Sequence, residues 1–280
     1  MEKDIFCIYH GNCADGFGAA WVVREAYRTG SSVQFHKAFH DDPFWPREEI
    51  KDKIVYLVDF SYSRDVILAM SKVAYRIVII DHHKTAIDDL VDLPFNVELF
   101  ADINHSGAML AWKYFFPKLE VPELIKLIED RDLWKFSMAG TREVSAALFS
   151  YPYEFEVWDT LMLSNAISLY DDGVAIERKH FKDINELLPK ISRMINIDGY
   201  LVMTANLPYT LGVDAANILA ADQPFGCTYY DLANRTRYYS LRSDKNGLDV
   251  SLIAKKFGGG GHKHAAAFTI DFEDAQGFEI

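Results

Sequence analysis

Three short apolar segments near the N-terminus constrain the fold more than any other feature of this sequence. Residues 4–10 (DIFCIYH), 53–60 (KIVYLVDF) and 75–81 (YRIVIID) are almost continuously apolar. Segments with helical spacing follow at 19–27 and 64–73. Continuous apolar strands that alternate with helices are typical of parallel strands buried on both faces. We therefore expect an α/β fold whose N-terminal sheet is open, mostly parallel and flanked by helices.

Polar side chains stand at the ends of these three segments, at His10, Asp59 and Asp81. In an open α/β sheet, ligands bind beyond the carboxyl ends of the strands. The three side chains should therefore converge along one edge of the sheet. Each also has an ordinary structural explanation, as a helix cap or a polar loop residue.

The pattern after residue 105 predicts a mostly helical middle and then a second α/β part. A long amphipathic helix is expected at 165–195, interrupted by Pro189 alone. Strands are expected at 199–206, 227–230 and 237–242, and a short helix at 249–257. We predict three parts: a sheet domain, a helical connector, and a smaller C-terminal α/β domain with a mixed sheet, at residues 1–150, 151–196 and 197–280.

Composition argues against several classes of protein. Half of the 280 residues are hydrophobic, which is ample for a packed core and excludes global disorder. With 29 Lys and Arg against 41 Asp and Glu, the formal net charge of −12 argues against coating long nucleic acid by charge alone. Three cysteines form no paired framework, which favours a reducing compartment. The apolar run at 5–9 is too short for a signal peptide or a membrane span, so we expect a cytoplasmic protein without a membrane partner.

Residues with metal-binding chemistry gather in four motifs. They are HGNCADG with His10, Cys13 and Asp15, the lone Asp59, DHH with Asp81, His82 and His83, and EDRD with Asp130 and Asp132. Imidazole with carboxylates suits Mn, Fe or Zn, and carboxylate-rich mixtures favour Mn or Mg. Taken singly, the first motif is as often a polar loop, and the last a charged helix end.

Four consecutive glycines at 258–261 stand directly before His262. Their unshielded backbone N–H groups let the chain approach phosphate oxygens closely. A flexible linker is the alternative, although linkers rarely run straight into an apolar segment such as 265–270. The candidate phosphate contacts are Gly259, Gly260, Gly261, His262 and Arg242. For Arg242 the alternative is an ordinary surface arginine.

The motifs together resemble the DHH phosphoesterase family. HxxCxDG at 10–16, Asp59, DHH at 81–83, the acidic cluster at 129–132 and GGGGH at 258–262 occur in the family's order over nearly the whole chain. The resemblance implies a metal-binding catalytic domain, followed by a DHH-associated domain whose GGGH loop binds substrate. Within the family, the sequence is most similar to small oligoribonucleases and nucleotide phosphodiesterases.

The resemblance also implies a ligand set. Two Mn2+ ions, with Mg2+, Fe or Zn as alternatives, would be held by His10, Asp15, Asp59, His82 and Asp130. Asp59 would bridge the ions, Asp81 would support the site, and His83 would touch the scissile phosphate. Ser106 resembles the start of a small-residue helix near that phosphate. Either Asp130 or Asp132 could be the fourth-motif ligand, and the spacing to the following aromatic favours Asp130.

One residue departs from the family pattern: Cys13 stands where an Asp is usual. A thiolate is a softer ligand than a carboxylate. Three outcomes are open: a weakened Mn site, a preference for Zn or Fe, or a position left to water.

The implied activity is a metal-dependent phosphodiesterase or exonuclease that uses water activated by two metals. Its substrates would be short oligonucleotides, linear dinucleotides or 3′-phosphoadenosine 5′-phosphate, not long nucleic acid, and a homodimer is left open. Two alternatives remain. One is hydrolysis of a phosphoanhydride such as pyrophosphate or short polyphosphate, and the other is a nucleotide-binding sensor with one impaired metal site.

Overall fold

The computed structural model describes residues 3–39, 45–164 and 166–275. The chain forms two compact units, Met1–Glu177 and Arg178–Ile280. The boundary between them falls inside helix α8 (Tyr170–Ile191). None of the described helices is both long and apolar enough to cross a membrane.

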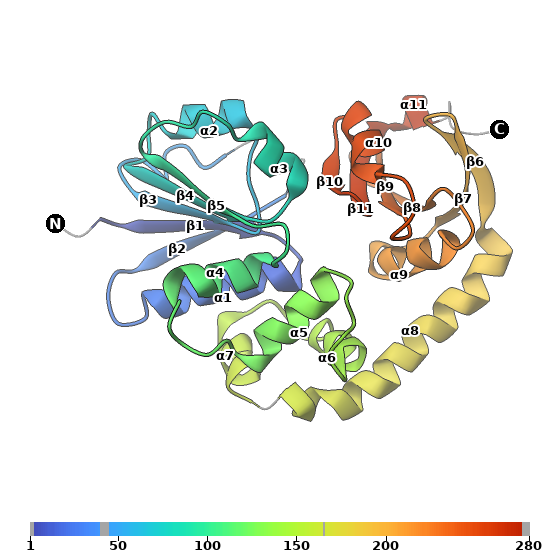
Figure 1. Cartoon of the computed structure of the whole chain (residues 1–280), viewed down its shortest axis with the longest axis horizontal. Coiled ribbons are helices and arrows are strands. Elements are labelled where there is room, and N and C mark those ends of the chain that lie inside the picture. Colours follow the sequence, from blue (N-terminus) through green and yellow to red (C-terminus); the bar gives the residue numbers. More distant parts are fainter. Residues whose placement is uncertain (1–2, 40–44, 165, 276–280) are drawn as a thin grey trace. The chain divides into compact units, whose positions relative to one another are not determined.

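A five-stranded parallel sheet forms the centre of the first unit (Figure 1). Its order is β2-β1-β3-β4-β5. The strands are β1 (Ile5–His10), β2 (Val33–Ala38), β3 (Ile54–Val58), β4 (Arg76–Asp81) and β5 (Val97–Ala101). The three apolar segments are the three central strands, which confirms the predicted open parallel sheet. After β1 the chain forms its neighbour β2 on one side, and after β3 it forms β4 on the opposite side. The strand order therefore reverses direction between β1 and β3. Ligands of such sheets bind at this switch point.

Helices cover both faces of this sheet (Figure 1). Helices α1 (Ala14–Ala26) and α4 (Gly107–Phe115) pack on one face, and α2 (Arg64–Met70) and α3 (Lys84–Asp89) lie on the other. The two faces have separate hydrophobic cores, which explains why the central strands are apolar on both sides.

The rest of the first unit is helical. It contains α5 (Glu123–Asp132), α6 (Thr141–Leu148), α7 (Phe155–Leu163) and a 3-10 turn at Ala166–Leu169. These helices extend the core beside α1, around the fully buried Trp158.

The second unit is built on a six-stranded mixed sheet with the order β10-β11-β9-β8-β7-β6. Its strands are β6 (Arg193–Ile197), β7 (Tyr200–Asn206), β8 (Gly226–Asp231), β9 (Thr236–Arg242), β10 (Gly260–His262) and β11 (Ala265–Asp271). Strands β7 and β8 are parallel, and the other neighbours are antiparallel. Helices α9 (Tyr209–Leu219), α10 (Val250–Lys256) and α11 (Phe272–Ala275) complete the unit.

One local prediction is wrong. The helix expected to continue to residue 195 ends at Ile191, two residues after Pro189, and β6 follows. Ile195 and Ile197 are buried and Asn196 between them is exposed, so the period of two outweighs the helical pattern.

The glycine run belongs to the second sheet and is not the flexible linker that was its alternative. Its second half is strand β10, which pairs with β11. A side chain would prevent this approach, because a Cβ atom on Gly259 would lie 2.0 Å from the carbonyl oxygen of Ala267.

Candidate metal centre

The candidate site lies at the carboxyl ends of β1, β3 and β4, at the switch point of the first sheet. His10 ends β1, Asp81 ends β4, and Asp59 follows β3. Asp59 has a left-handed backbone (φ 52°), which is uncommon for a residue other than glycine. Its N–H donates to the carbonyl oxygen of Ile80 at 2.9 Å, so the neighbouring strand holds it in this conformation. Backbone conformations of this kind cluster at functional sites.

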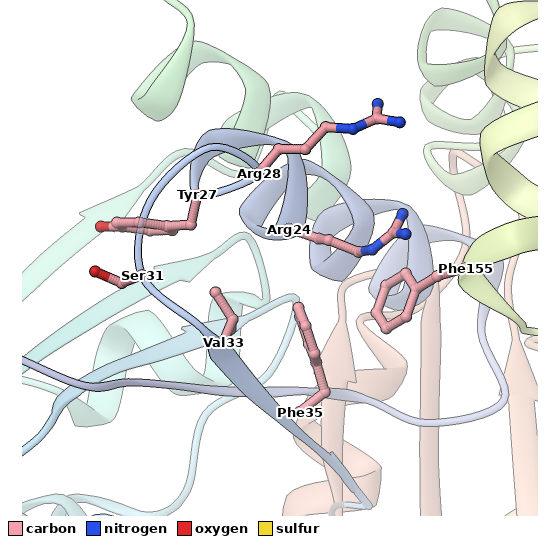
Figure 2. A pocket seen from close by; sticks show the side chains of 7 residues that line it. All are labelled: Arg24, Tyr27, Arg28, Ser31, Val33, Phe35 and Phe155. Carbon is pink, nitrogen blue, oxygen red and sulfur yellow. The ribbon is translucent and has the colours of Figure 1, made fainter.

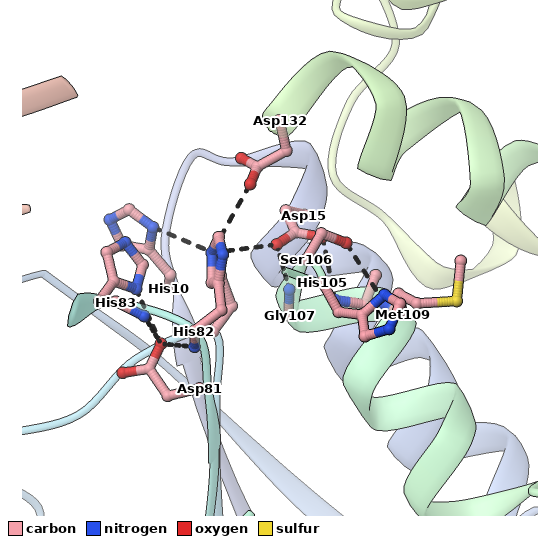
Figure 3. A network of polar contacts seen from close by, with 12 residues as sticks. His10, Asp15, Asp81, His82, His83, His105, Ser106, Gly107, Met109 and Asp132 are labelled. Carbon is pink, nitrogen blue, oxygen red and sulfur yellow. Dashed lines mark hydrogen bonds and ion pairs between the residues drawn. The ribbon is translucent and has the colours of Figure 1, made fainter. Parts of the chain in front are cut away.

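The two carboxylate oxygens of Asp59 face different histidines. Oδ1 lies 3.1 Å from Nε2 of His82, and Oδ2 lies 3.6 Å from Nδ1 of His10. Figure 3 shows His82 with His10 on one side and Asp15 and Asp132 on the other. Asp59 thus stands between two groups of donor atoms.

The first group, here called the Cys13 cluster, consists of His10, Cys13 and Asp59. The second, the Asp15 cluster, consists of Asp15, Asp59 and His82. Within each cluster the donor atoms lie within 4.8 Å of one another. Donors bound to one divalent ion lie within roughly 4–5 Å of one another, because each bond is about 2.0–2.6 Å long. Both clusters therefore fit a divalent metal ion, and they share Asp59.

The N-terminus of helix α4 fixes Asp15 in the cluster. The N–H groups of Gly107 and Ala108 donate to its two oxygens at 2.6 and 2.9 Å. A helix N-terminus favours an anion in this position. Gly107 also lies directly against Asp59, because a Cβ atom at Gly107 would be 2.4 Å from Cβ of Asp59. No local sequence pattern predicted either contact of Gly107.

Ser106, predicted to lie near the phosphate, is fully buried. Its hydroxyl accepts a hydrogen bond from the N–H of Met109 at 3.4 Å and caps α4. In this structure Ser106 supports the helix that holds Asp15.

The structure separates the two acids of the fourth motif. Oδ2 of Asp132 lies 3.6 Å from Nε2 of His82. The carboxylate of Asp130 is turned away and accepts hydrogen bonds from the residues after α5. The donors are the N–H and hydroxyl of Ser137, the N–H of Met138 and the hydroxyl of Thr141. The expected preference for Asp130 as the metal ligand is therefore not supported by the geometry. Asp132, not Asp130, lies beside the Asp15 cluster.

Asp81 holds the DHH segment in place. It is fully buried, and its Oδ1 accepts from the N–H of His82 at 2.8 Å and lies 2.7 Å from Nδ1 of His83. Burial alone would raise the pKa of Asp81, but the charge and hydrogen bond of His83 lower it. Burial likewise opposes a charged His83, yet Asp81 raises the pKa of that imidazole. The pair therefore orients His83 and favours its protonated form.

Charge interactions in the clusters are strong because the groups are buried. Burial would raise the pKa of Asp59, but hydrogen bonds from His10 and His82 hold it well below its usual value. Burial would lower the pKa of His82, but Asp59 and Asp132 raise it well above its usual value. Burial and the charges of Asp59 and Asp132 raise the pKa of Asp15. Such opposed shifts are typical of functional sites.

The predicted phosphate contacts lie in the second unit. The strand register places His262 opposite Ala265, and Ala265 opposite Arg242. Directly paired residues point to the same face of a sheet, so His262 and Arg242 share a face with a small alanine between them. The Arg242 guanidinium donates to the carbonyl oxygen of Leu241 at 2.8 Å and to the Ser240 hydroxyl at 3.1 Å.

A surface pocket elsewhere in the first unit is lined by Arg24, Arg28, Phe155 and neighbouring residues (Figure 2). Its two guanidinium groups are paired with Asp159 at 2.7 Å and Glu25 at 3.0 Å. None of the predicted site residues lines it. The pocket does not belong to the candidate metal centre.

No protein-family model matches this chain. An uncharacterised protein of Acanthamoeba polyphaga mimivirus is 29% identical over 281 residues, which cover 94% of this chain and 66% of the viral protein. The chain thus spans slightly less than two thirds of this curated relative.

Two solved structures share the architecture of this chain. RecJ of Thermus thermophilus, solved in complex with Mn2+, has a TM-score of 0.51 and 16% identity over 96% of this chain and 50% of RecJ. An exopolyphosphatase-related protein from Bacteroides fragilis has a TM-score of 0.54 and 16% identity over 98% of this chain and 89% of its own. The likeness shows that the chain shares its fold with these two proteins.

Proposed function

We propose that this chain is a phosphoester hydrolase that depends on two divalent metal ions, one at each cluster. The observation that carries the proposal is the position of Asp59, whose two oxygens face the two separate donor groups. A carboxylate in this position can bridge a pair of ions. Ions held there would supply positive charge to a phosphate and lower the pKa of the attacking water.

Mn2+ is the ion we propose for the Asp15 cluster. Three carboxylates and one imidazole surround it, counting Asp132. Carboxylate-rich sites suit Mn2+ or Mg2+. RecJ, which has this fold, was solved in complex with Mn2+.

We propose that His83 donates a hydrogen bond to the substrate phosphate. Asp81 orients its ring and favours the protonated form, so it can give a charge-assisted hydrogen bond to a phosphate oxygen. During hydrolysis, water adds to phosphorus and the bond from phosphorus to the leaving oxygen breaks. A fixed donor stabilises the charge that develops on the phosphoryl oxygens.

The second unit is the proposed substrate-binding part, with Arg242, His262 and the glycine strand contacting a further phosphate. Short oligonucleotides, linear dinucleotides or 3′-phosphoadenosine 5′-phosphate fit this role best. Because the formal net charge is −12, the surface as a whole repels phosphates, and the substrate must be bound by the metals and a few local donors. Such a surface disfavours a long nucleic-acid strand.

Polyphosphate hydrolysis is the second candidate function. It is favoured by the fold shared with the exopolyphosphatase-related protein over 98% of this chain. The same two metals would serve a phosphoanhydride bond.

A substrate panel tests the proposal. The purified chain is incubated with Mn2+ and dinucleotides, five-nucleotide and thirty-nucleotide RNA, 3′-phosphoadenosine 5′-phosphate or polyphosphate, with and without EDTA. Asp59→Asn is the test variant, and Asp88→Asn, an exposed acid paired with Lys84, is its matched control. We expect mononucleotide release from the short substrates. EDTA and the Asp59→Asn substitution should each abolish this release, and Asp88→Asn should retain it. Phosphate release from polyphosphate alone would favour the second candidate. Turnover insensitive to both EDTA and Asp59→Asn would overturn a metal-dependent site.

A further inference from the structure

The two clusters differ in one donor atom. The Cys13 cluster combines a thiol sulfur, an imidazole nitrogen and a carboxylate oxygen. The Asp15 cluster, with Asp132 beside it, offers oxygen and nitrogen alone. Asp59 belongs to both, so Cys13 is what makes their chemistry unequal.

The backbone positions Cys13 at this site. It is the N-cap residue of α1, with an extended backbone, and its side chain makes no capping hydrogen bond to that helix in the described chain. Asn12 before it adopts a left-handed conformation (φ 54°). Gly16 lies so close to β1 that a Cβ atom there would be 2.3 Å from the carbonyl oxygen of His10. The turn is thus packed against the strand end that carries His10.

The other two cysteines have different surroundings. Cys7 and Cys227 are fully buried, each in the hydrophobic core of its own unit. Cys13 is partly exposed and lies among metal-ligating side chains. This contrast supplies an internal control for any sulfur-specific signal.

Charge balance is consistent with a thiolate ligand. With a Cys13 thiolate, the anionic donors are Cys13, Asp15, Asp59 and Asp132. Four negative charges match two divalent ions. Cys13 therefore conserves the charge that a carboxylate would supply while changing the softness of the donor. Thiolates favour Zn2+ and other soft or borderline ions, whereas carboxylates favour Mn2+ and Mg2+.

We propose that the two clusters bind different metals: a thiophilic divalent ion of the Zn2+ or Fe2+ class at His10, Cys13 and Asp59, and Mn2+ or Mg2+ at Asp15, Asp59, His82 and Asp132. The inference rests on the metal dependence in the proposed function and is independent of the substrate. A mixed pair, with one ion bound through sulfur, follows from the donor sets.

Cobalt spectroscopy tests the sulfur bond without any activity measurement. Metal-free protein is titrated with Co2+, and the near-ultraviolet absorption band of a cobalt–thiolate bond is recorded. We expect the band in the wild type and in Cys227→Ala, and its loss in Cys13→Asp and Cys13→Ser. Absence of the band in wild-type protein that binds two Co2+ ions would overturn the inference.

Metal content gives a second measurement. The wild type and Cys13→Asp are given one equivalent of Zn2+, dialysed against an excess of Mn2+, and analysed by mass spectrometry, because Zn2+ at equal concentration would outcompete Mn2+ at either cluster. We expect about one Zn2+ and one Mn2+ per wild-type chain and a higher Mn2+ share in Cys13→Asp. Identical metal ratios in the wild type and Cys13→Asp would contradict the inference. This comparison does not need the Cys13→Ser variant, so it holds even if that variant fails to fold.

The two proposals fail in different ways. Absence of the cobalt–thiolate band from wild-type protein that still hydrolyses its substrate removes the mixed pair and leaves the hydrolase intact. A metal-loaded protein that cleaves none of the phosphoester or phosphoanhydride substrates removes the hydrolase and leaves the metal assignment standing.

Discussion

Nε2 of His82 lies 3.1 Å from Oδ1 of Asp59, and both residues are about 1% exposed. This contact pairs a histidine of raised pKa with a carboxylate of lowered pKa. A metal ion bound at the Asp15 cluster would need the same nitrogen and oxygen atoms. Protons and metal ions therefore compete for this pair.

Metal binding should release protons and strengthen as the pH rises. The charges of Asp59 and Asp132 overcome burial and raise the pKa of His82, so its imidazole binds a proton more tightly than a free imidazole does, and that proton must leave before Nε2 can ligate. Affinity should increase until the pH passes the raised pKa. Mn2+ calorimetry across pH, in buffers of different ionisation enthalpy, measures both effects.

His82→Gln should lose most of this proton release. His180→Gln, at a partly buried histidine of the second unit paired with Asp214, should keep it. A Mn2+ affinity that stayed constant between pH 6 and 9 would contradict the competition.

Gly107→Ala should weaken metal binding and destabilise the protein. The new Cβ atom would meet Cβ of Asp59 at 2.4 Å, so Asp59 or helix α4 must move. Overpacking of this kind costs about 1–3 kcal/mol of unfolding free energy. Gly30→Ala is the matched control, because nothing lies within 4 Å of its added Cβ atom. Thermal unfolding and Mn2+ titration of both variants test this, and equal behaviour would count against the close packing.

The two acids of the fourth motif should have opposite mutant phenotypes. Asp130 accepts hydrogen bonds from Ser137, Met138 and Thr141; burial opposes its charge, but these bonds lower its pKa to about 2. Asp130→Asn should therefore reduce stability by roughly 1–3 kcal/mol, because an amide nitrogen cannot accept from these donors. Asp132→Asn should keep the stability and weaken metal binding instead. Denaturant unfolding and metal titration separate the two, and the reverse pattern would restore Asp130 as the ligand.

His83→Gln should lower turnover and leave metal content unchanged. The variant keeps a hydrogen-bond donor but loses the charge that Asp81 favours. Removing such a donor outright costs about 10²–10³ in turnover, so the loss in this variant should not exceed that range. Steady-state kinetics with metal analysis checks this. Loss of metal together with turnover would show that His83 is a metal ligand rather than a hydrogen-bond donor to the phosphate.

Sequence patterns predicted the centre of the first sheet better than its edges. Strands β1, β3 and β4 are buried on both faces, so their apolar runs are unmistakable. The edge strands β2 and β5 are half-exposed and mix polar with apolar residues, which hides their period. The two-residue period of β6 was likewise missed.

The candidate site shows the same division. Its short-range motifs were visible, because Asp81, His82 and His83 are consecutive. The choice between Asp130 and Asp132 depends on the turn that follows α5, and the contact of Gly107 with Asp15 joins residues 92 positions apart. Such contacts are set by packing of distant elements, which one sequence does not encode in any local pattern.

The metal stoichiometry of Asp59→Asn, measured beside its dinucleotide hydrolysis, tests the central claim most directly. Because Asp59 faces both clusters, its loss should lower the bound metal from two divalent ions per chain and abolish hydrolysis together, while Asp88→Asn retains both. An Asp59→Asn protein that still binds two ions and cleaves dinucleotides at the wild-type rate would contradict the account.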